Sequence, residues 1–158
     1  MGGAPRYSID TSSLVAAWAE RYPIDAFPSF WDRMSGLIAS GALVACREVL
    51  RELQRRDKEL HDWCKAHNGF FVEIDDPMQD KVIEIMAQYP KFVDERTGKS
   101  AGDPFVIALA SRHSPYLVVV TEEDGGTAQR PKIPFVCRQE DVPCINLLQL
   151  IREQGWRI

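Results

Sequence analysis

The chain has 158 residues, of which 45% are hydrophobic and 27% are charged, an ordinary composition for a folded domain. Its formal net charge of −4 excludes attraction to polyanions by overall charge, although a local basic groove is compatible with it. The sequence has neither an apolar run long enough to span a membrane nor the apolar core of a signal peptide. We therefore expect one domain over residues 1–158 that is cytoplasmic and has no membrane partner.

The first predicted element is a short strand that begins at Tyr7 and ends on the carboxylate of Asp10. The hydroxyl residues Thr11 and Ser12 follow it, and an apolar helical pattern covers residues 14–19. In open α/β sheets, ligands bind beyond the carboxyl ends of the strands, which is where this carboxylate stands. Asp is also a favoured helix N-cap, so capping alone is a second interpretation of Asp10.

A second helix is predicted over residues 27–38, where aromatic and aliphatic residues recur at helical spacing and form a core stripe. A short strand at residues 43–45 follows, and then a long, highly charged helical pattern that continues to His67. At 100° per residue, Glu48 lies about 150° from the centre of the apolar face of this helix, and Glu52 lies about 110° from it. We therefore expect Glu52 to border a cleft, and Glu48 to point toward solvent and pair with an arginine.

Residues 70–74 predict a third strand, and Asp75 with Asp76 precedes a proline in a pattern typical of a helix N-terminus. That helix extends to Tyr89, and a polar, basic loop follows it over residues 90–102.

Residues 103–110 are apolar on nearly every side and predict a buried helix, at whose start Asp103 is a plausible N-cap. A continuous apolar strand over residues 116–121 suits a parallel sheet covered on both faces. It ends at Thr121 and is followed directly by Glu122, Glu123 and Asp124. A glycine-containing loop, a helical turn, a last strand at 143–146 and a helix at 147–154 complete the chain.

Strands that alternate with helices predict an α/β fold with a parallel sheet and helices on both faces. Carboxylates recur at the start of the buried helix and at the ends of two strands, with Glu52 as a further candidate. Three or four that converge on one crevice would form a site for Mg²⁺ or Mn²⁺, since hard cations prefer oxygen ligands. Two such ions can activate water and stabilise the leaving oxygen of a phosphodiester.

The cysteines offer no competing metal site. None of the four forms a Cys-x-x-Cys pair, and the six residues between Cys137 and Cys144 match no common zinc-binding spacing. We expect reduced and mostly buried thiols.

The chain resembles PIN-domain proteins in four short motifs that occur in that family's order. They are residues 9–12 (Ile-Asp-Thr-Ser), the Glu52-Leu53 pair, residues 101–108 (Ala-Gly-Asp-Pro-Phe-Val-Ile-Ala) and residues 119–121 (Val-Val-Thr). Residues 132–137 and 144–147 resemble a less characterised bacterial and archaeal PIN-like subfamily. The resemblance implies a three-layer α/β/α fold with a central parallel sheet of about five strands.

The resemblance also implies a metal-dependent endoribonuclease that uses Mg²⁺ or Mn²⁺, similar to the VapC-type toxins that a cognate antitoxin protein silences. Asp10, Glu52 and Asp103 match the family's metal-binding acidic positions, and Thr121 and Ser12 match hydroxyl positions that orient the site. The fourth acidic position departs from the usual Thr-x-Asp pattern, because Glu123 stands there and Asp124 comes one residue later. We favour Glu123 as the fourth metal ligand and keep Asp124 as the alternative.

Other functions remain open. A PIN-like module that binds RNA or protein without cutting is compatible with the unusual acidic segment, and a phosphohydrolase for small phosphoesters is a third candidate. RNA and an antitoxin are the expected partners, with a homodimer as a further option. Seven basic residues are candidates to guide a phosphate backbone: Arg51, Arg55, Lys91, Arg96, Lys99, Arg130 and Lys132.

Overall fold

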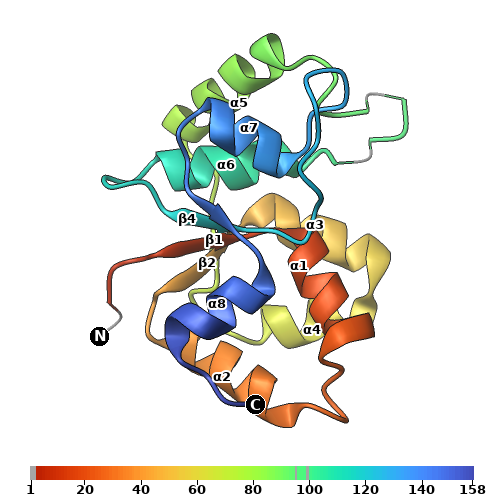
Figure 1. The fold of residues 1–158 in the computed structure, drawn as a ribbon, viewed down its shortest axis with the longest axis vertical. Coiled ribbons are helices and arrows are strands. Elements are labelled where there is room, and N and C mark those ends of the chain that lie inside the picture. The colour runs from red at the N-terminus through yellow and green to blue at the C-terminus, as the bar shows by residue number, and fades with distance from the viewer. Residues whose placement is uncertain (1–2, 95, 99) are drawn as a thin grey trace.

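The computed structural model describes residues 3–94, 96–98 and 100–158, and within these residues it shows a five-stranded, all-parallel sheet between two layers of helices (Figure 1). The α5, α6 and α7 helices cover one face, and α1, α2, α4 and α8 cover the other. The predicted fold class is therefore confirmed: this is a three-layer α/β/α fold with a central parallel sheet of five strands. The strands are β1 (Tyr7–Ile9), β2 (Leu43–Cys46), β3 (Phe71–Val72), β4 (Val118–Val120) and β5 (Cys144–Ile145). The helices are α1 (Thr11–Ala16), the π-helical turn η1 (Ala17–Arg21), α2 (Pro28–Ala39), α3 (Arg47–Arg56), α4 (Lys58–Lys65), α5 (Asp76–Gln88), α6 (Asp103–Ser111), α7 (Ile133–Gln139) and α8 (Leu147–Gln154).

The strand order β3-β2-β1-β4-β5 places the first strand at the centre of the sheet. In the register of the sheet, Tyr7 pairs with Leu43 on one side and with Val118 on the other. The chain builds outward from β1 through β2 to β3 and then returns to add β4 and β5 on the other side. Ligand crevices of open α/β sheets lie at such a reversal, outside the carboxyl ends of the two strands. Here those ends are the residues that follow β1 and β4.

The core forms on both faces of this central strand. On one face α6 is buried nearly all round, as predicted, and Val106 accepts a hydrogen bond at its carbonyl from the buried Ser8 hydroxyl of β1, at 2.9 Å. On the other face Phe30 and Trp31 of α2 are fully buried and pack edge to face. Phe27 is 37% exposed, because it precedes the first residue of α2 and so falls outside its buried stripe.

Two predicted elements differ in their boundaries. The helical pattern from residue 47 to 67 is not continuous: α3 ends at Arg56, and Asp57 adopts an extended conformation and caps α4 by accepting a hydrogen bond from the Leu60 N–H at 3.1 Å. The third strand covers two residues instead of five, because β3 is an edge strand that pairs with β2 alone. Across the described ranges, no helix is both long and apolar enough to cross a membrane.

Candidate functional site

Asp10 follows β1 and is held on three sides. Its Oδ1 accepts a hydrogen bond from the Ser13 N–H at 2.8 Å, so it caps α1 as the capping interpretation predicted. Its Oδ2 accepts hydrogen bonds from the Ser12 hydroxyl at 2.7 Å and from the Thr121 hydroxyl at 2.6 Å. Burial raises the pKa of Asp10 to about 6, although these hydrogen bonds favour the ionised form. Capping and membership of an acidic cluster are therefore compatible at this residue.

The two hydroxyls connect the ends of β1 and β4. Thr121, which is 2% exposed, accepts the Glu123 N–H at 3.1 Å while it donates to Asp10. Ser12 accepts the Glu122 N–H at 3.2 Å. Each hydroxyl donates a hydrogen bond to Asp10 and accepts one from a backbone N–H of the segment after β4. These paired hydrogen bonds fix the orientation of the Asp10 carboxylate relative to that segment.

Asp103 is not a helix cap. Gly102, in a helical conformation, occupies the capping position of α6, and Asp103 is the first helical residue and makes no capping hydrogen bond. The prediction of an N-cap is wrong because the helix begins one residue earlier than a capping aspartate would allow. The side chain is 7% exposed, and its pKa is raised well above the usual value by burial and by the charges of Glu123 and Asp10. These causes show that the carboxylates lie close together.

Glu52 and Glu48 occupy successive turns of α3, and both line the same cavity. Glu52 accepts a hydrogen bond from the Thr11 hydroxyl at 3.3 Å, and burial raises its pKa. The prediction that Glu48 points toward solvent is wrong, since its side chain is only 18% exposed. The predicted ion pair is present, because Arg51 binds Glu48 at 2.8 Å. Within the part of the chain that the structure describes, Glu52 is therefore the α3 carboxylate that forms no ion pair with a basic side chain.

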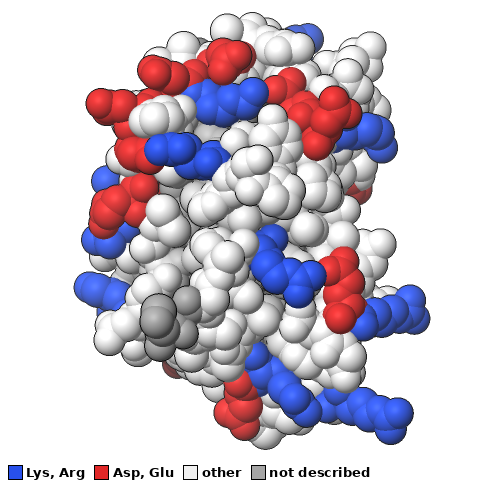
Figure 2. Space-filling model, turned by 90° about the vertical axis from the view of Figure 1, so that its left-hand side faces the viewer, with Lys and Arg blue, Asp and Glu red and all other residues white. Residues whose placement is uncertain are grey.

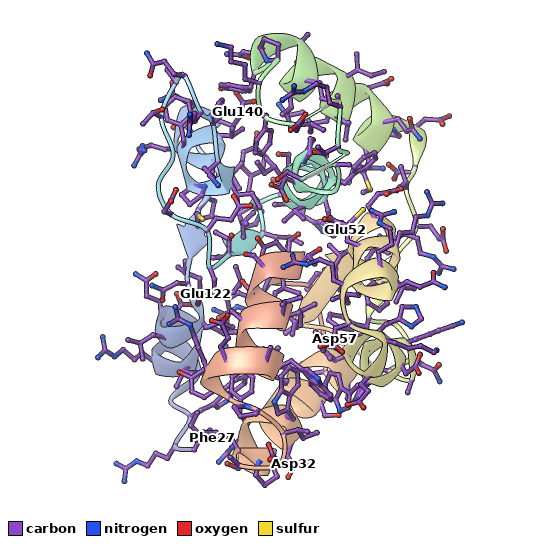
Figure 3. The ribbon with its side chains drawn as sticks, turned by 90° about the vertical axis from the view of Figure 1, so that its right-hand side faces the viewer. Phe27, Asp32, Glu52, Asp57, Glu122 and Glu140 are labelled. Atoms are coloured by element: carbon purple, nitrogen blue, oxygen red, sulfur yellow. The ribbon has the colours of Figure 1, made fainter. Side chains whose placement is uncertain are left out.

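The backbone of Gly102 approaches Glu52 too closely to allow a side chain. A Cβ atom at position 102 would lie 1.9 Å from the Glu52 Oε1 and 3.7 Å from the Cβ of Glu48. The start of α6 thus packs directly against α3, and the Glu52 carboxylate lies over the peptide that precedes Asp103. Figure 3 shows Glu52 where α3 passes the start of α1 and α6.

Glu123 and Asp124 lie in different environments. The Glu123 Oε2 accepts a hydrogen bond from the Ile133 N–H at 3.1 Å, and the residue lines the cavity. Asp124 is exposed. The structure therefore brings Asp10, Glu52, Asp103 and Glu123 together and leaves Asp124 outside this group.

The cavity between these residues has a volume of about 860 Å³ and a rim of basic side chains. Arg51, Arg55 and Arg56 line it from α3, and Lys132 lines it from the segment before α7. A second cavity of about 680 Å³ is lined by Lys91, Arg96, Arg130 and Lys132. Lys99, also predicted as a guide for phosphates, lies outside the described residues. On the opposite side of the molecule, Figure 2 shows acidic and basic side chains interspersed around a largely uncharged middle.

The donor chemistry of the site fits a hard divalent cation. Its candidate ligands are carboxylate oxygens. Burial raises the pKa values of Asp10 and Asp103, and the nearby charge of Glu123 raises both further, as expected where carboxylates lie close together. Among the described residues, no three His, Cys, Asp or Glu side chains stand in an arrangement that could hold a metal ion as they are. The chemistry of the oxygen donors is therefore what favours a metal at this site.

The sequence comparison decides the family. A family described as a domain of unknown function, DUF4411, matches residues 7–158. The chain belongs to the DUF4411 family. The match includes the ends of β1 and β4, the start of α6 and the exposed Asp124. Curated proteins provide no significant sequence match.

Solved structures similar to this DUF4411 chain share its fold at low sequence identity. The crystal structure of PAE2754 from Pyrobaculum aerophilum is 18% identical, with a TM-score of 0.53 over 97% of this chain and 98% of that one. The structure of FitAB bound to an IR36 DNA fragment is 17% identical, with a TM-score of 0.54 over 89% and 94%. FitAcB from Neisseria gonorrhoeae is 18% identical, with a TM-score of 0.53 over 89% and 96%. At this identity the likeness shows the fold alone.

Some residues of the DUF4411 site were not predicted from the sequence. Thr11 was recognised as a neighbour of Asp10, but its hydrogen bond to Glu52 was not. Arg56 lines the cavity but is not among the basic residues that the sequence identified as guides for a phosphate backbone. The role of Gly102 has no local signal, because it depends on a contact with a helix 50 residues earlier in the chain.

The positions of Glu123 and Asp124 allow a prediction about the fourth ligand. We expect Glu123→Gln to weaken Mn²⁺ binding by about tenfold or more, because it removes a charge beside Asp103, while Asp124→Asn changes it little. Isothermal titration of Mn²⁺ into the two variants measures this. The reverse ranking would assign the role to Asp124.

Proposed function

We propose that this protein is a metal-dependent endoribonuclease and the toxin of a toxin–antitoxin pair. The observation that carries the proposal is the convergence of Asp10, Glu52, Asp103 and Glu123 at the crevice between the carboxyl ends of β1 and β4. The PIN-like fold and the resemblance of the four sequence motifs to PIN domains support the same activity.

The four carboxylates would hold Mg²⁺ or Mn²⁺, with Asp124 as an alternative to Glu123. When bound, the metal supplies a Lewis acid that polarises a phosphoryl oxygen and lowers the pKa of water. The protein's own contribution is to orient the carboxylates. Ser12 and Thr121 fix the Asp10 carboxylate through its Oδ2, and Thr11 holds the Oε1 of Glu52.

The shape and charge of the site favour a polymer over a small phosphoester. The main cavity of about 860 Å³ adjoins a second one, and basic residues line both. Arg55 and Arg56 line the main cavity from α3, and Lys132 lines it from the segment before α7. Cations that separate elements bring to one reactive centre suit a substrate that carries phosphates before and after the scissile bond.

The cellular role follows from the resemblance to VapC-type toxins. It implies a cognate antitoxin that binds this protein and keeps it inactive. A homodimer is a further option for its assembly, and we propose a cytoplasmic location, where RNA is present.

The first test is cleavage of RNA by the purified protein. We expect internal cuts in single-stranded RNA that require Mg²⁺ or Mn²⁺ and stop when EDTA is added. Asp103→Asn should lower the rate by about a hundredfold or more, because it removes a charge from the centre of the cluster. Sequencing of RNA ends, in vitro and after induced expression, measures both results.

Matched controls separate the alternatives. Asp124→Asn also removes one carboxylate charge from the acidic segment, but at an exposed position, so it should cut nearly as fast as the wild type. Binding of RNA without any cut in the presence of Mn²⁺ would indicate a non-cleaving module. Hydrolysis of a small phosphoester but not of RNA would indicate a phosphohydrolase.

A further inference from the structure

The main cavity and the second cavity meet at three residues, Ser100, Asp103 and Lys132, which line both. Asp103 belongs to the acidic cluster, whereas Lys132 brings a positive charge to the same junction. A strand that passes from one cavity to the other must therefore cross beside this lysine. The inference drawn below rests on the proposed ribonuclease function.

The chain around Lys132 is held in place by short-range contacts. A Cβ atom on Gly126, which has φ of +74°, would lie 2.6 Å from the Lys132 N and 2.7 Å from its Cβ, so the loop doubles back directly against the lysine. Thr127 and Arg130 close that loop with two hydrogen bonds of 3.0 Å. On the other side, the Ile133 N–H donates to Glu123 in the acidic cluster. The position of Lys132 is therefore tied to the cluster.

The charge of Lys132 is not neutralised by an ion pair. Arg51 pairs with Glu48, but within the described ranges Lys132 has no such partner, and neither do Lys91 and Arg130 farther along the second cavity. Lys132 is half-buried, whereas Lys91 and Arg130 are exposed. A half-buried ammonium group beside a cleft gains more from an incoming anion than an exposed one, since water screens it less.

We propose that Lys132 binds the phosphate adjacent to the scissile one and directs the RNA strand from the main cavity into the second cavity. Lys91 and Arg130 then contact phosphates farther along the same strand. Lys132 is a positioning residue: it acts on the substrate's path and leaves the chemical step to the carboxylates. The second cavity is accordingly the subsite that makes long RNA a better substrate than short RNA.

The test measures how the rate of cleavage depends on RNA length in the wild type and in Lys132→Gln. A series of oligonucleotides that contain one cut site is extended by single nucleotides, at either end, and kcat/KM is measured with Mn²⁺. Wild-type protein should gain about tenfold to hundredfold when the extension reaches the second cavity, the effect expected of one charged hydrogen bond. Lys132→Gln should lose that gain through a rise in KM, so that its kcat/KM no longer increases with RNA length.

Two further variants separate positioning from folding and from general charge. Lys132→Arg keeps the cation and should restore most of the gain. Lys65→Gln removes a charge from the exposed face of α4 and should keep the whole length dependence. Thermal melting of each variant identifies any that fails to fold.

The outcomes distinguish the inference from the function on which it rests. Failure of the wild type to cut any RNA would overturn the proposed function. If the wild type cuts but Lys132→Gln keeps the length gain, or slows all lengths equally, the assignment of Lys132 is wrong and the ribonuclease stands.

Discussion

Asp103→Ala is expected to leave the metal-free protein as stable as the wild type or more stable. A true N-cap would cost about 0.5–2 kcal/mol on removal, but Asp103 makes no capping hydrogen bond. What the substitution removes is a buried carboxylate that is repelled by Glu123, Asp10 and Glu52. At about 4 Å and an effective dielectric near 20, two such charges repel by about 4 kcal/mol, so relief of part of that repulsion offsets the lost contacts.

The stability that Asp103→Ala gains over the wild type should increase with pH. A carboxyl whose pKa is raised in the folded state carries no penalty below the unfolded value of 3.8, and it destabilises the protein increasingly as pH rises through the folded value. The advantage of Asp103→Ala should therefore be smallest near pH 4 and should grow toward neutral pH. Asp10 follows the same rule. Its pKa is raised from 3.8 to about 6, which corresponds to a loss of about 3 kcal/mol of folding stability at neutral pH.

Denaturant unfolding in EDTA and in excess Mn²⁺ provides the measurement. Wild type should gain about 2.7 kcal/mol when free Mn²⁺ is a hundredfold above its dissociation constant, and Asp103→Ala should lose that response. A variant that is destabilised equally in both buffers, and that still responds to Mn²⁺, would show that Asp103 has only a structural role.

Gly102→Ala is expected to abolish most cleavage while the protein stays folded. The new methyl group would lie 1.9 Å from the Glu52 Oε1, so that carboxylate must leave its position over the start of α6. Glu52 is half-buried and borders the cavity, which gives the displaced side chain somewhere to go. We expect a loss of about a hundredfold in the cleavage rate, similar to the removal of one charge-stabilising group, with a small change in melting temperature.

Gly125→Ala is the matched control. It adds the same methyl group near the acidic segment, but nothing lies within 4 Å of the position that the methyl would occupy. Rates of RNA cleavage and Mn²⁺ titrations of the two variants make the comparison. Equal activity of both would show that the position of Glu52 over Gly102 does not matter.

The sequence was sufficient for features that depend on local chemistry. Asp10 could be assigned to the end of a strand because a short strand pattern, Tyr7 to Ile9, precedes it and hydroxyls follow it. The buried α6 could be predicted because it is apolar on every side. Helix periodicity was enough to place Glu52 at a cleft, since only the angle from the apolar face was required.

Features that depend on contacts between distant elements could not be predicted. Glu48 is shielded by the ion pair with Arg51 and by the cavity wall, so its angle on the helix alone gave the wrong exposure. The packing of Gly102 against α3 requires knowledge of how closely the two helices approach. The break at Asp57 had a local signal, a favoured capping residue, but the charged pattern on both sides suggested one helix.

The central place of β1 in the sheet has a consequence for synthesis on the ribosome. The β1 strand pairs with both β2 and β4, and Val118 to Val120 of β4 emerge from the ribosome more than 100 residues after β1. Asp10 likewise accepts a hydrogen bond from the Thr121 hydroxyl, which emerges equally late. Such long separations between partners slow folding. A growing chain that has not yet released β4 therefore cannot assemble the acidic cluster, which forms only after Thr121 and Glu123 have emerged.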